Sequence, residues 1–314
     1  MKTYEKLYLL LASTPDYVSG QEVADQLQLS RTSIWKAAQK LETLGLTIES
    51  SPKKGYRLLT GDLLIPETIK ENSPLAQVLF DPKGESTQVV AKTAAQNGYQ
   101  GDTLFLANQQ TKAYGRFGRT YFAPDKGGIY MTLLLKSDLT VQEVPRYTLK
   151  MVAAIHKAIE ELTGLVTSIK WVNDLYYKGK KIAGILTEAS ASVETGLITD
   201  LYIGMAINFN IMEFPEDLKE KAGSLFQEER PAITRNQLIA AIWRHFYTAD
   251  WSELLERYKK HSLVVGHTIR FQQNKKDYQG LATGISDHGQ LLVQLEDGTQ
   301  MSLASGEISL SGWD

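Results

Sequence analysis

The spacing of apolar residues changes twice along this chain, and each change marks the start of a different kind of structure. Up to about residue 45, apolar side chains recur at three- and four-residue intervals, which predicts helices. From about residue 66 helical and strand patterns alternate, and after residue 263 only short strand patterns remain, separated by glycines. The sequence therefore predicts a multidomain α+β protein with domains at residues 1–62, 66–263 and 264–314.

The composition excludes several classes of protein. Of the 314 residues 43% are hydrophobic and 22% charged, which is ordinary for a globular protein and excludes disordered and fibrous chains. The absence of cysteine excludes disulfides, thiolate metal sites and cysteine nucleophiles, and it suits a reducing compartment. No apolar run approaches the roughly 18 residues that a membrane-spanning helix needs. We therefore expect a cytoplasmic protein that makes no membrane contact.

Residues 1–62 have the pattern of a winged helix-turn-helix. Ser19 and Glu22 have the S-x-x-E spacing of a capping box, and Ser30 can cap a further helix that Gly45 ends. Two short helices joined by a tight turn fit a DNA major groove, and strand patterns on either side of residues 51–55 predict a hairpin wing. The candidate DNA-binding residues are Arg31, Thr32, Ser33, Lys36, Lys53 and Lys54.

The charge of this region supports an anionic partner. Residues 31–57 carry six basic and two acidic side chains, a balance of +4, although the whole chain has a net charge of −2. Such a local basic patch suggests that an anion docks at one end of the protein. Two alternatives stay open at this point: a solvated basic face, and a three-helix bundle that docks another protein. Trp35 is expected to be a packing or interface residue.

Common catalytic motifs are absent from the central region. There is no GxxxxGK[ST] phosphate loop, GxGxxG fingerprint, HExxH zinc motif or GxSxG elbow. The five histidines are scattered singly, which leaves a zinc site without ligands. His156 and Glu160 lie one turn apart in a predicted helix at residues 144–163 and are expected on a solvated face. Loops and basic side chains would therefore have to bind any nucleotide.

One loop suits that role. Within residues 109–119, two glycines allow consecutive backbone amides to face one anion, and Arg116 and Arg119 supply forked donors that match carboxylate and phosphate oxygens. The alternative is a mobile surface loop that happens to contain two arginines.

Two further segments place polar groups beside strands. An Asn173-Asp174 turn follows an apolar strand, and Lys181 begins the next strand of a predicted hairpin, where its ammonium can reach over a cleft. Asn208 ends another strand. Simple solvation is the alternative for Lys181.

These segments, in this order, resemble the family of bifunctional biotin-protein ligases and biotin-operon repressors over the whole chain. Residues 86–88 stand where the family has Ser-Thr-Asn, and residues 110–119 where it has Q-T-x-G-R-G-R-x-G-R. Residues 170–175 are similar to K-W-P-N-D-L, residues 181–186 to K-x-A-G-I-L, and residues 204–210 to G-x-G-I-N-V-N.

The resemblance implies a fold for each part. It implies an N-terminal winged helix-turn-helix, a central mixed α/β domain like that of class II synthetases, and a C-terminal SH3-like β-barrel. The closely spaced strand patterns at 264–271, 278–285, 291–295, 300–304 and 307–310 independently favour a small closed or nearly closed barrel. In the central domain we expect strands at residues 103–107, 129–135, 182–188 and 197–209, and closing helices within residues 238–260.

The resemblance also implies an activity. Biotin and ATP, with Mg²⁺, would form biotinyl-5′-AMP, and biotin would pass to a lysine of the biotin carboxyl carrier domain of a carboxylase. The same adenylate would act as corepressor by promoting a homodimer that binds operator DNA. The alternatives are a ligand-sensing regulator without ligase activity, a lipoate-type ligase, and a biotin ligase that does not regulate.

By family position, the resemblance assigns site residues. Lys181 and Arg116 would be catalytic, and no metal site built by the protein is implied. The biotin-binding residues would be Ser86, Thr87, Gln88, Gln110, Tyr114, Gly115, Arg116 and Lys181, and the nucleotide-binding residues Arg119, Asn173, Asp174 and Asn208. Whether Asn173 and Asp174 orient the loop or a metal ion stays open at this point.

The chain departs from the family pattern at several positions. Gln88 replaces Asn, Val172 replaces Pro, and Met205 with Ala206 interrupts a glycine pattern. Ala113 with Tyr114 replaces Gly-Arg, which removes one guanidinium from the loop, so Arg116 and Lys181 are expected to carry more of the anion contact.

Overall fold

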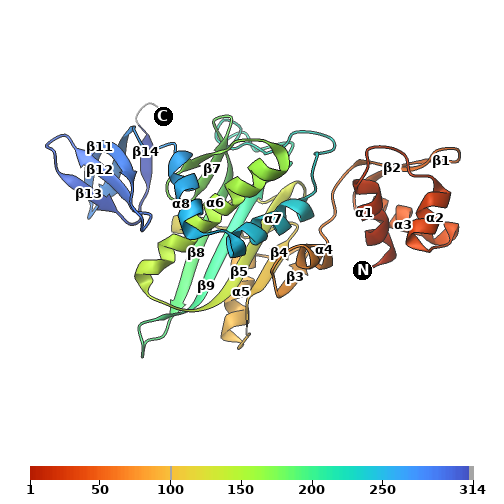
Figure 1. The fold of residues 1–314 in the computed structure, drawn as a ribbon, viewed down its shortest axis with the longest axis horizontal. Coiled ribbons are helices and arrows are strands. Elements are labelled where there is room, and N and C mark those ends of the chain that lie inside the picture. Colours follow the sequence, from red (N-terminus) through yellow and green to blue (C-terminus); the bar gives the residue numbers. More distant parts are fainter. Residues whose placement is uncertain (100, 311–314) are drawn as a thin grey trace.

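The computed structural model describes residues 1–99 and 101–310. Three parts follow one another in space as they do in the sequence, with the N-terminal helices at one end, a large central sheet, and a small C-terminal sheet at the other end (Figure 1). No helix in these residues is both long and apolar enough to cross a bilayer.

The N-terminal part is the expected winged helix-turn-helix. The Ser19 and Ser30 hydroxyls accept the amides of Glu22 and Ser33, at 3.1 and 3.2 Å, which confirms both predicted N-caps. Glu22 does not complete a capping box, because its carboxylate accepts from Gln26 instead. The elements are α1 (Thr3–Ala12), α2 (Gly20–Leu27), α3 (Arg31–Thr43) and a hairpin of β1 (Thr47–Ser51) and β2 (Gly55–Thr60).

This part has its own apolar core, which fixes the orientation of α3. Ile34 and Leu41 are fully buried against Leu7, Leu11 and neighbouring side chains. Because a helix that buries one stripe presents the opposite stripe to solvent, the basic N-terminal half of α3 faces outward.

Hydrogen bonds tie the N-terminal part to the central one. Asp62, in the linker after β2, accepts from the Tyr8 hydroxyl of α1 at 2.8 Å and from the Arg235 amide at 2.8 Å. The buried Arg235 guanidinium forms an ion pair with Asp62 at 3.4 Å and also donates to Asn108 and to the Gly128 carbonyl, both at 2.9 Å. A single buried cation therefore joins the linker to the residues just after β4 (Thr103–Ala107) and at the start of β5 (Gly128–Leu139).

The central part is a seven-stranded sheet, as far as the structure describes the chain, in the order β3-β4-β5-β9-β8-β7-β6. β3 and β4 are parallel, and every other neighbouring pair is antiparallel. The predicted strands are present, although β5 and β8 are longer than expected. The remaining strands are β3 (Gln77–Asp81), β6 (Ser168–Lys170), β7 (Asp174–Tyr177), β8 (Lys180–Ala191) and β9 (Ile198–Asn208).

Helices cover both faces of this sheet (Figure 1). On one face α6 (Val144–Thr163) packs against α7 (Arg235–Thr248) and α8 (Trp251–Lys260) above the main apolar core. On the other face α5 (Thr87–Gln96) covers β4, β5 and β9, with a small cluster around Ala91 and Phe105. The sequence did not predict α5 or the short α4 (Pro66–Glu71).

The expectation that His156 lies on a solvated face is wrong. His156 is fully buried, because α8 packs against α6, and its ring lies 4.2 Å from that of His261. Burial, with the nearby charges of His261 and Arg257, lowers the pKa of His156 to about 4. Its helical neighbour Glu160 pairs with Arg257.

The C-terminal part is a five-stranded antiparallel sheet within the described residues, in the order β13-β12-β11-β10-β14. The expected strands are present, but the first starts at Thr268 rather than Val264, because Gly266, at φ +86°, turns the chain before it. The strands are β10 (Thr268–Gln273), β11 (Lys276–Ile285), β12 (Leu291–Leu295), β13 (Gln300–Leu303) and β14 (Ile308–Leu310). Its apolar side chains continue the core of the central part.

The buried His156 predicts a pH dependence of stability. An unfolded histidine has a pKa of about 6.5, whereas the folded one is near 4. The unfolded state therefore binds more protons between these values, so His156 should lower the free energy of unfolding by about 3 kcal/mol as the pH drops through that window, in addition to the contributions of the other titrating groups. Urea unfolding at several pH values measures this free energy. It should change less steeply with pH in His156→Leu than in the wild type.

Exposed His288 provides the matched control, since His288→Gln should keep the wild-type dependence of the unfolding free energy on pH. The same pH dependence in His156→Leu and the wild type would contradict the prediction.

Candidate active site

A cavity of about 470 Å³ opens beside the arginine loop. Its wall includes Thr132 of β5 and Gly204 of β9, together with residues 306–309 at the start of β14. It also brings together eleven of the twelve predicted small-molecule site residues: Ser86, Thr87, Gln88, Gln110, Tyr114, Gly115, Arg116, Arg119, Asn173, Asp174 and Lys181.

The start of α5 forms a buried polar corner of this cavity. The Thr87 amide donates to the side-chain oxygen of Gln110 at 2.6 Å, and the Thr87 hydroxyl lies 3.2 Å from the same oxygen. The Thr87 hydroxyl also lies 2.9 Å from the hydroxyl of Thr132. These bonds fix the beginning of the loop against the beginning of the helix.

Gln88 is buried beside this corner, with 5% of its surface exposed. Its side-chain oxygen accepts from Thr132 at 3.0 Å, and its side-chain nitrogen donates to Glu188 at 2.9 Å. Gly204 makes room for it, since a Cβ atom there would lie 2.3 Å from the Gln88 oxygen. The longer side chain, relative to the family Asn, therefore fits because residue 204 has none.

Arg116 lies over the opposite side of the cavity. Its guanidinium donates to the Asn173 side-chain oxygen at 3.2 Å, and the Asn173 nitrogen donates to the Ile185 carbonyl of β8 at 2.9 Å. Burial lowers the pKa of Arg116, and Asp174 and Glu307 act in the opposite direction. Asn173 thus connects the loop to the sheet.

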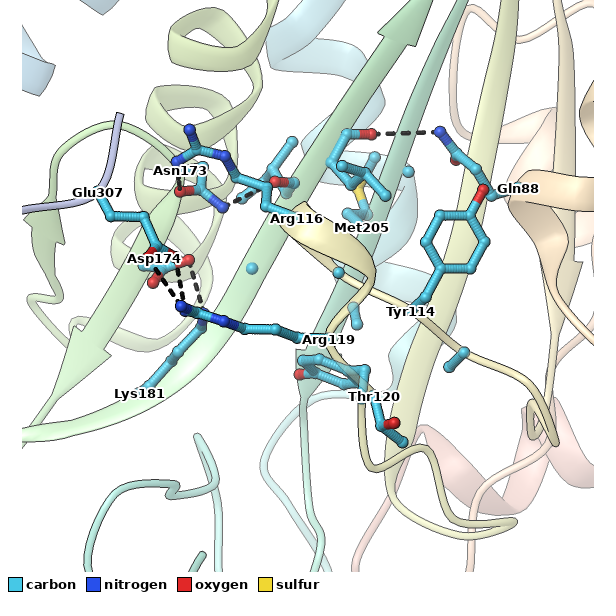
Figure 2. A pocket seen from close by; sticks show the side chains of 18 of the residues that line it. Gln88, Tyr114, Arg116, Arg119, Thr120, Asn173, Asp174, Lys181, Met205 and Glu307 are labelled. Carbon is cyan, nitrogen blue, oxygen red and sulfur yellow. Dashed lines mark hydrogen bonds and ion pairs between the residues drawn. The ribbon is translucent and has the colours of Figure 1, made fainter. Parts of the chain in front are cut away.

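Lys181 and Asp174 face each other across neighbouring strands. The Lys181 ammonium lies 2.7 Å from an Asp174 oxygen. Lys170, at the end of β6, lines the same cavity, and burial lowers the pKa of its ammonium despite the charge of Asp174. Figure 2 shows Lys181, Asp174, Arg119 and Glu307 pointing toward one another.

Glu307 is a site residue that the sequence did not indicate. Its carboxylate contacts both terminal nitrogens of Arg119, at 2.6 and 2.7 Å. With 69% of the Arg119 side chain exposed, this pair contributes little to stability by itself. A ligand anion can therefore replace Glu307 at small cost.

The lining carries an excess of positive charge. Among the described residues, four cationic side chains (Arg116, Arg119, Lys170 and Lys181) face two acidic ones (Asp174 and Glu307), which leaves two positive charges. Forked and ammonium donors that converge in this way suit carboxylate and phosphate oxygens. The cavity is built to hold anions.

Asn208 is the predicted site residue that lies outside this lining. It is buried, and its side-chain nitrogen donates to the Gly223 carbonyl at 2.9 Å. Its oxygen accepts from the Tyr121 hydroxyl at 3.2 Å. Its nucleotide role stays a prediction, and Tyr121 rather than Asn208 reaches the cavity.

Of the unpredicted lining residues, some left a signal in the sequence and some did not. Thr132 interrupts an apolar strand, and Lys170 precedes the Trp171 segment, so both could have been suspected. Trp171 is 3% exposed, as expected of a core residue, although it also borders the cavity. Glu307 follows the loop by almost two hundred residues, and although it begins a predicted strand, no motif connects it with the cavity.

The described residues contain no group of three or more histidine or acidic side chains arranged to hold a metal ion. Asp174 is the carboxylate nearest the Lys181 ammonium in the cavity. Any cation here would need most of its oxygen ligands from a bound phosphate or from water.

Five of the six predicted DNA-binding side chains are exposed. Arg31, Thr32 and Lys36 are exposed on α3, and Lys53 and Lys54 are exposed at the tip of the wing. Ser33 is half-buried because it supports the Ser30 cap. Trp35 is 51% exposed, which excludes a core role, and an interface role stays a prediction.

Three family models match consecutive parts of the chain. An HTH domain matches residues 3–57, the biotin/lipoate A/B protein ligase family matches residues 82–208, and the biotin protein ligase C terminal domain matches residues 264–311.

Similar proteins cover nearly the whole chain. The bifunctional ligase/repressor BirA of Bacillus subtilis (strain 168) is 32% identical, over 94% of each chain. That of Escherichia coli (strain K12) is 27% identical, over 97% of this chain and 96% of the other. The structure of the biotin protein ligase from Aquifex aeolicus in complex with biotin and ATP has a TM-score of 0.61 and 26% identity, over 75% of this chain and 99% of that chain.

The contact between Gln88 and Gly204 predicts a coupled pair of substitutions. Gly204→Ala places a methyl group against a Gln88 amide that is held by hydrogen bonds, so it should destabilise the fold by about 1–3 kcal/mol through overpacking. In a Gln88→Asn background, where the side chain is one methylene shorter, the same change should cost less than half as much. Urea unfolding of the four proteins measures both costs.

Gly284→Ala is the control, because a Cβ atom there makes only an ordinary contact of 4.0 Å. Equal costs of Gly204→Ala in the two backgrounds would contradict the proposed contact.

Proposed function

The chain belongs to the family of bifunctional biotin ligase/repressor proteins, and on this basis we propose that its cavity joins biotin to ATP while its N-terminal helices bind DNA. The enzyme is an ATP-dependent, AMP-forming biotin-protein ligase, and its intermediate biotinyl-5′-AMP is also the corepressor. The observation that carries this function is the convergence of Arg116 and Lys181, from separate segments, on one cavity.

The reaction needs positioning and charge rather than a covalent enzyme intermediate. A biotin carboxylate oxygen attacks the α-phosphorus of ATP and pyrophosphate leaves. A lysine amine of the acceptor then attacks the carbonyl carbon of the mixed anhydride, loses a proton and expels AMP. Fixed cations beside the two anions lower both barriers, because they oppose the repulsion between the reactants and the charge that gathers on phosphorus.

The buried corner suits the uncharged end of biotin. Gln110 offers its side-chain NH₂ group, since its oxygen already accepts from Thr87. Ser86, Thr87 and Gln88 supply the neighbouring polar atoms, all nine-tenths or more buried, where a matched hydrogen bond discriminates strongly against other ligands. Tyr114 and Gly115 border the path from this corner to the cations.

The cationic side suits the carboxylate and the phosphates. Arg116 and Lys181 bind the biotin carboxylate and then the α-phosphate, and Arg119 exchanges Glu307 for a phosphate oxygen. Asn173 orients Arg116, and Asp174 holds Lys181 until the anion arrives. Asn208 supports the adenine side through Tyr121.

Mg²⁺ would offset the charge of the triphosphate when ATP is bound. Asp174 fits as a single protein ligand, because Mg²⁺ in nucleotide sites keeps waters and phosphate oxygens for its other positions. Its carboxylate and the amide oxygen of Asn173 lie on the cavity wall.

The repressor function places two winged helices on operator DNA through an adenylate-promoted homodimer. Acceptor protein, a biotin carboxyl carrier domain of a carboxylase, consumes the adenylate and relieves repression. This proposal includes a division into domains at residues 1–62, 66–263 and 264–314 and a cytoplasmic location. It also includes a central domain like that of class II synthetases and a C-terminal sheet that closes into an SH3-like barrel. The matched family models at 3–57, 82–208 and 264–311 support the division.

Exchange of labelled pyrophosphate into ATP tests substrate and reaction together. Biotin should support exchange and lipoate should not. Exchange with lipoate alone would favour a lipoate ligase, and no exchange beside ligand-dependent DNA binding would favour a regulator without catalysis.

Removing either cation should slow adenylation. Arg116→Ala and Lys181→Ala each remove a charge that contacts the reacting anions, so biotin-dependent exchange should fall roughly 100-fold or more in each. Lys112→Ala is the matched control, because Lys112 lies in the same loop, outside the cavity lining, in an exposed pair with Glu85. Wild-type exchange rates in both variants would overturn the site assignment.

Lysines at the wing tip should contact phosphates. Replacing Lys53 and Lys54 by Ala should weaken binding to operator and non-operator DNA alike. The slope of log affinity against log salt concentration should become smaller in magnitude by about 2. Gel shifts with biotin and ATP at several salt concentrations measure this, and exposed Lys83→Ala is the control. An unchanged slope would place the wing away from DNA.

A further inference from the structure

Glu188 of β8 lies just outside the cavity, yet its carboxylate contacts three side chains from two other segments. The Lys92 ammonium of α5 lies 2.8 Å from one oxygen. The other oxygen accepts from Gln88 at 2.9 Å and from the Tyr114 hydroxyl at 3.0 Å. Gln88 and Tyr114 both line the cavity, whereas Glu188 and Lys92 do not.

Lys92 closes this cluster. Its ammonium donates to the Tyr114 hydroxyl at 3.3 Å and lies 5.8 Å from the centre of the Tyr114 ring. The Tyr114 hydroxyl therefore accepts from Lys92 and donates to Glu188 at the same time. An arginine, which the family has at this position, carries donors only and cannot make both contacts.

The carboxylate is ionised in this setting. Burial raises the pKa of Glu188, but hydrogen bonds from Lys92, Gln88 and Tyr114 outweigh that effect and hold the pKa below its usual value. Hydrogen bonds to an ionised acceptor are stronger than neutral ones. About a third of the Lys92 and Glu188 side chains is exposed, so solvent weakens their ion pair without removing it.

Tyr114 connects this cluster to the turn that carries Arg116 and Arg119. Its backbone bridges to Thr120, the Tyr121 amide donates to the Ala113 carbonyl at 3.1 Å, and the Gly115 amide donates to the Arg119 carbonyl at 2.8 Å. These bonds close residues 113–121 into one compact turn. A Tyr114 that is fixed to the sheet therefore fixes the turn that carries Arg116.

We propose that Glu188, paired with Lys92, is a positioning residue for biotin: it holds Gln88 on one wall of the pocket and ties the arginine loop, through Tyr114, to the sheet before the ligand binds. This proposal rests on the proposed ligase function. A loop that is already ordered loses less conformational freedom on binding, and the gain appears as affinity for biotin.

Steady-state kinetics separate this role from chemistry. Tyr114→Phe keeps the ring and removes the hydroxyl, and it should raise KM for biotin roughly fivefold to tenfold with a much smaller change in kcat. Glu188→Gln should act in the same direction. The double variant should raise KM no more than the larger single change does, because either single substitution already disrupts the contact between Tyr114 and Glu188 that they share.

Trypsin gives a readout that needs no catalysis. Without ligand, cleavage after Arg116 and Arg119 should be slow in the wild type and several times faster in both variants. Lys92→Arg, which can keep the ion pair, should stay close to the wild type. Glu85→Gln is the matched control, because Glu85 pairs with Lys112 of the same loop but is exposed and outside the cavity lining.

The proposal is overturned if Tyr114→Phe leaves both KM and cleavage unchanged, if the two single effects add in the double variant, or if the change falls on kcat alone. Tyr114→Phe carries the same test by itself should Glu188→Gln fail to fold. A wild type that shows no biotin-dependent exchange refutes the ligase function instead, and the cleavage arm then still decides whether Glu188 holds the loop.

Discussion

The mutual repulsion of cations gathered in one small cavity is the constraint around which the site is built. Arg116, Lys170 and Lys181 are each partly withdrawn from water, where like charges repel more strongly than they do in solvent. Asp174 and Glu307 offset part of this charge, and Asn173 directs Arg116. An anionic ligand therefore neutralises the positive charge that the acidic side chains of the cavity leave over. The free energy gained by this neutralisation offsets the repulsion between the two anionic substrates.

Features that depend on neighbouring residues could be predicted from the sequence, and features that depend on distant packing could not. The caps at Ser19 and Ser30 are local hydrogen bonds, so their signals are local too. The convergence of Arg116 and Lys181 was predicted from the family pattern. The burial of His156 was not predicted because the helix that covers it lies about one hundred residues further along the chain. The contacts of Glu307 and Glu188 join residues far apart in the sequence, so no spacing of residues indicates them.

Two departures from the family pattern belong to one physical arrangement. Gln88 and Tyr114 replace Asn and Arg at separate positions, yet both donate to the same oxygen of Glu188. The longer amide has room beside that carboxylate because Gly204 has no side chain, and the phenol belongs to a turn that backbone hydrogen bonds close at residues 113–121. Each substitution taken alone is a mismatch to the family motif. Taken together, they give Glu188 of the sheet two hydrogen-bond donors, one of them from the loop in place of the family arginine.

Arg235 lies between the segments that flank the arginine loop and the N-terminal helices. Its guanidinium bonds Asn108 and the Gly128 carbonyl, which flank the loop, and pairs with Asp62, which accepts from Tyr8 of α1. Arg235 is 4% exposed, so a shift that broke these bonds would leave a buried charge without partners. One buried side chain therefore joins the linker to residues on both sides of the loop.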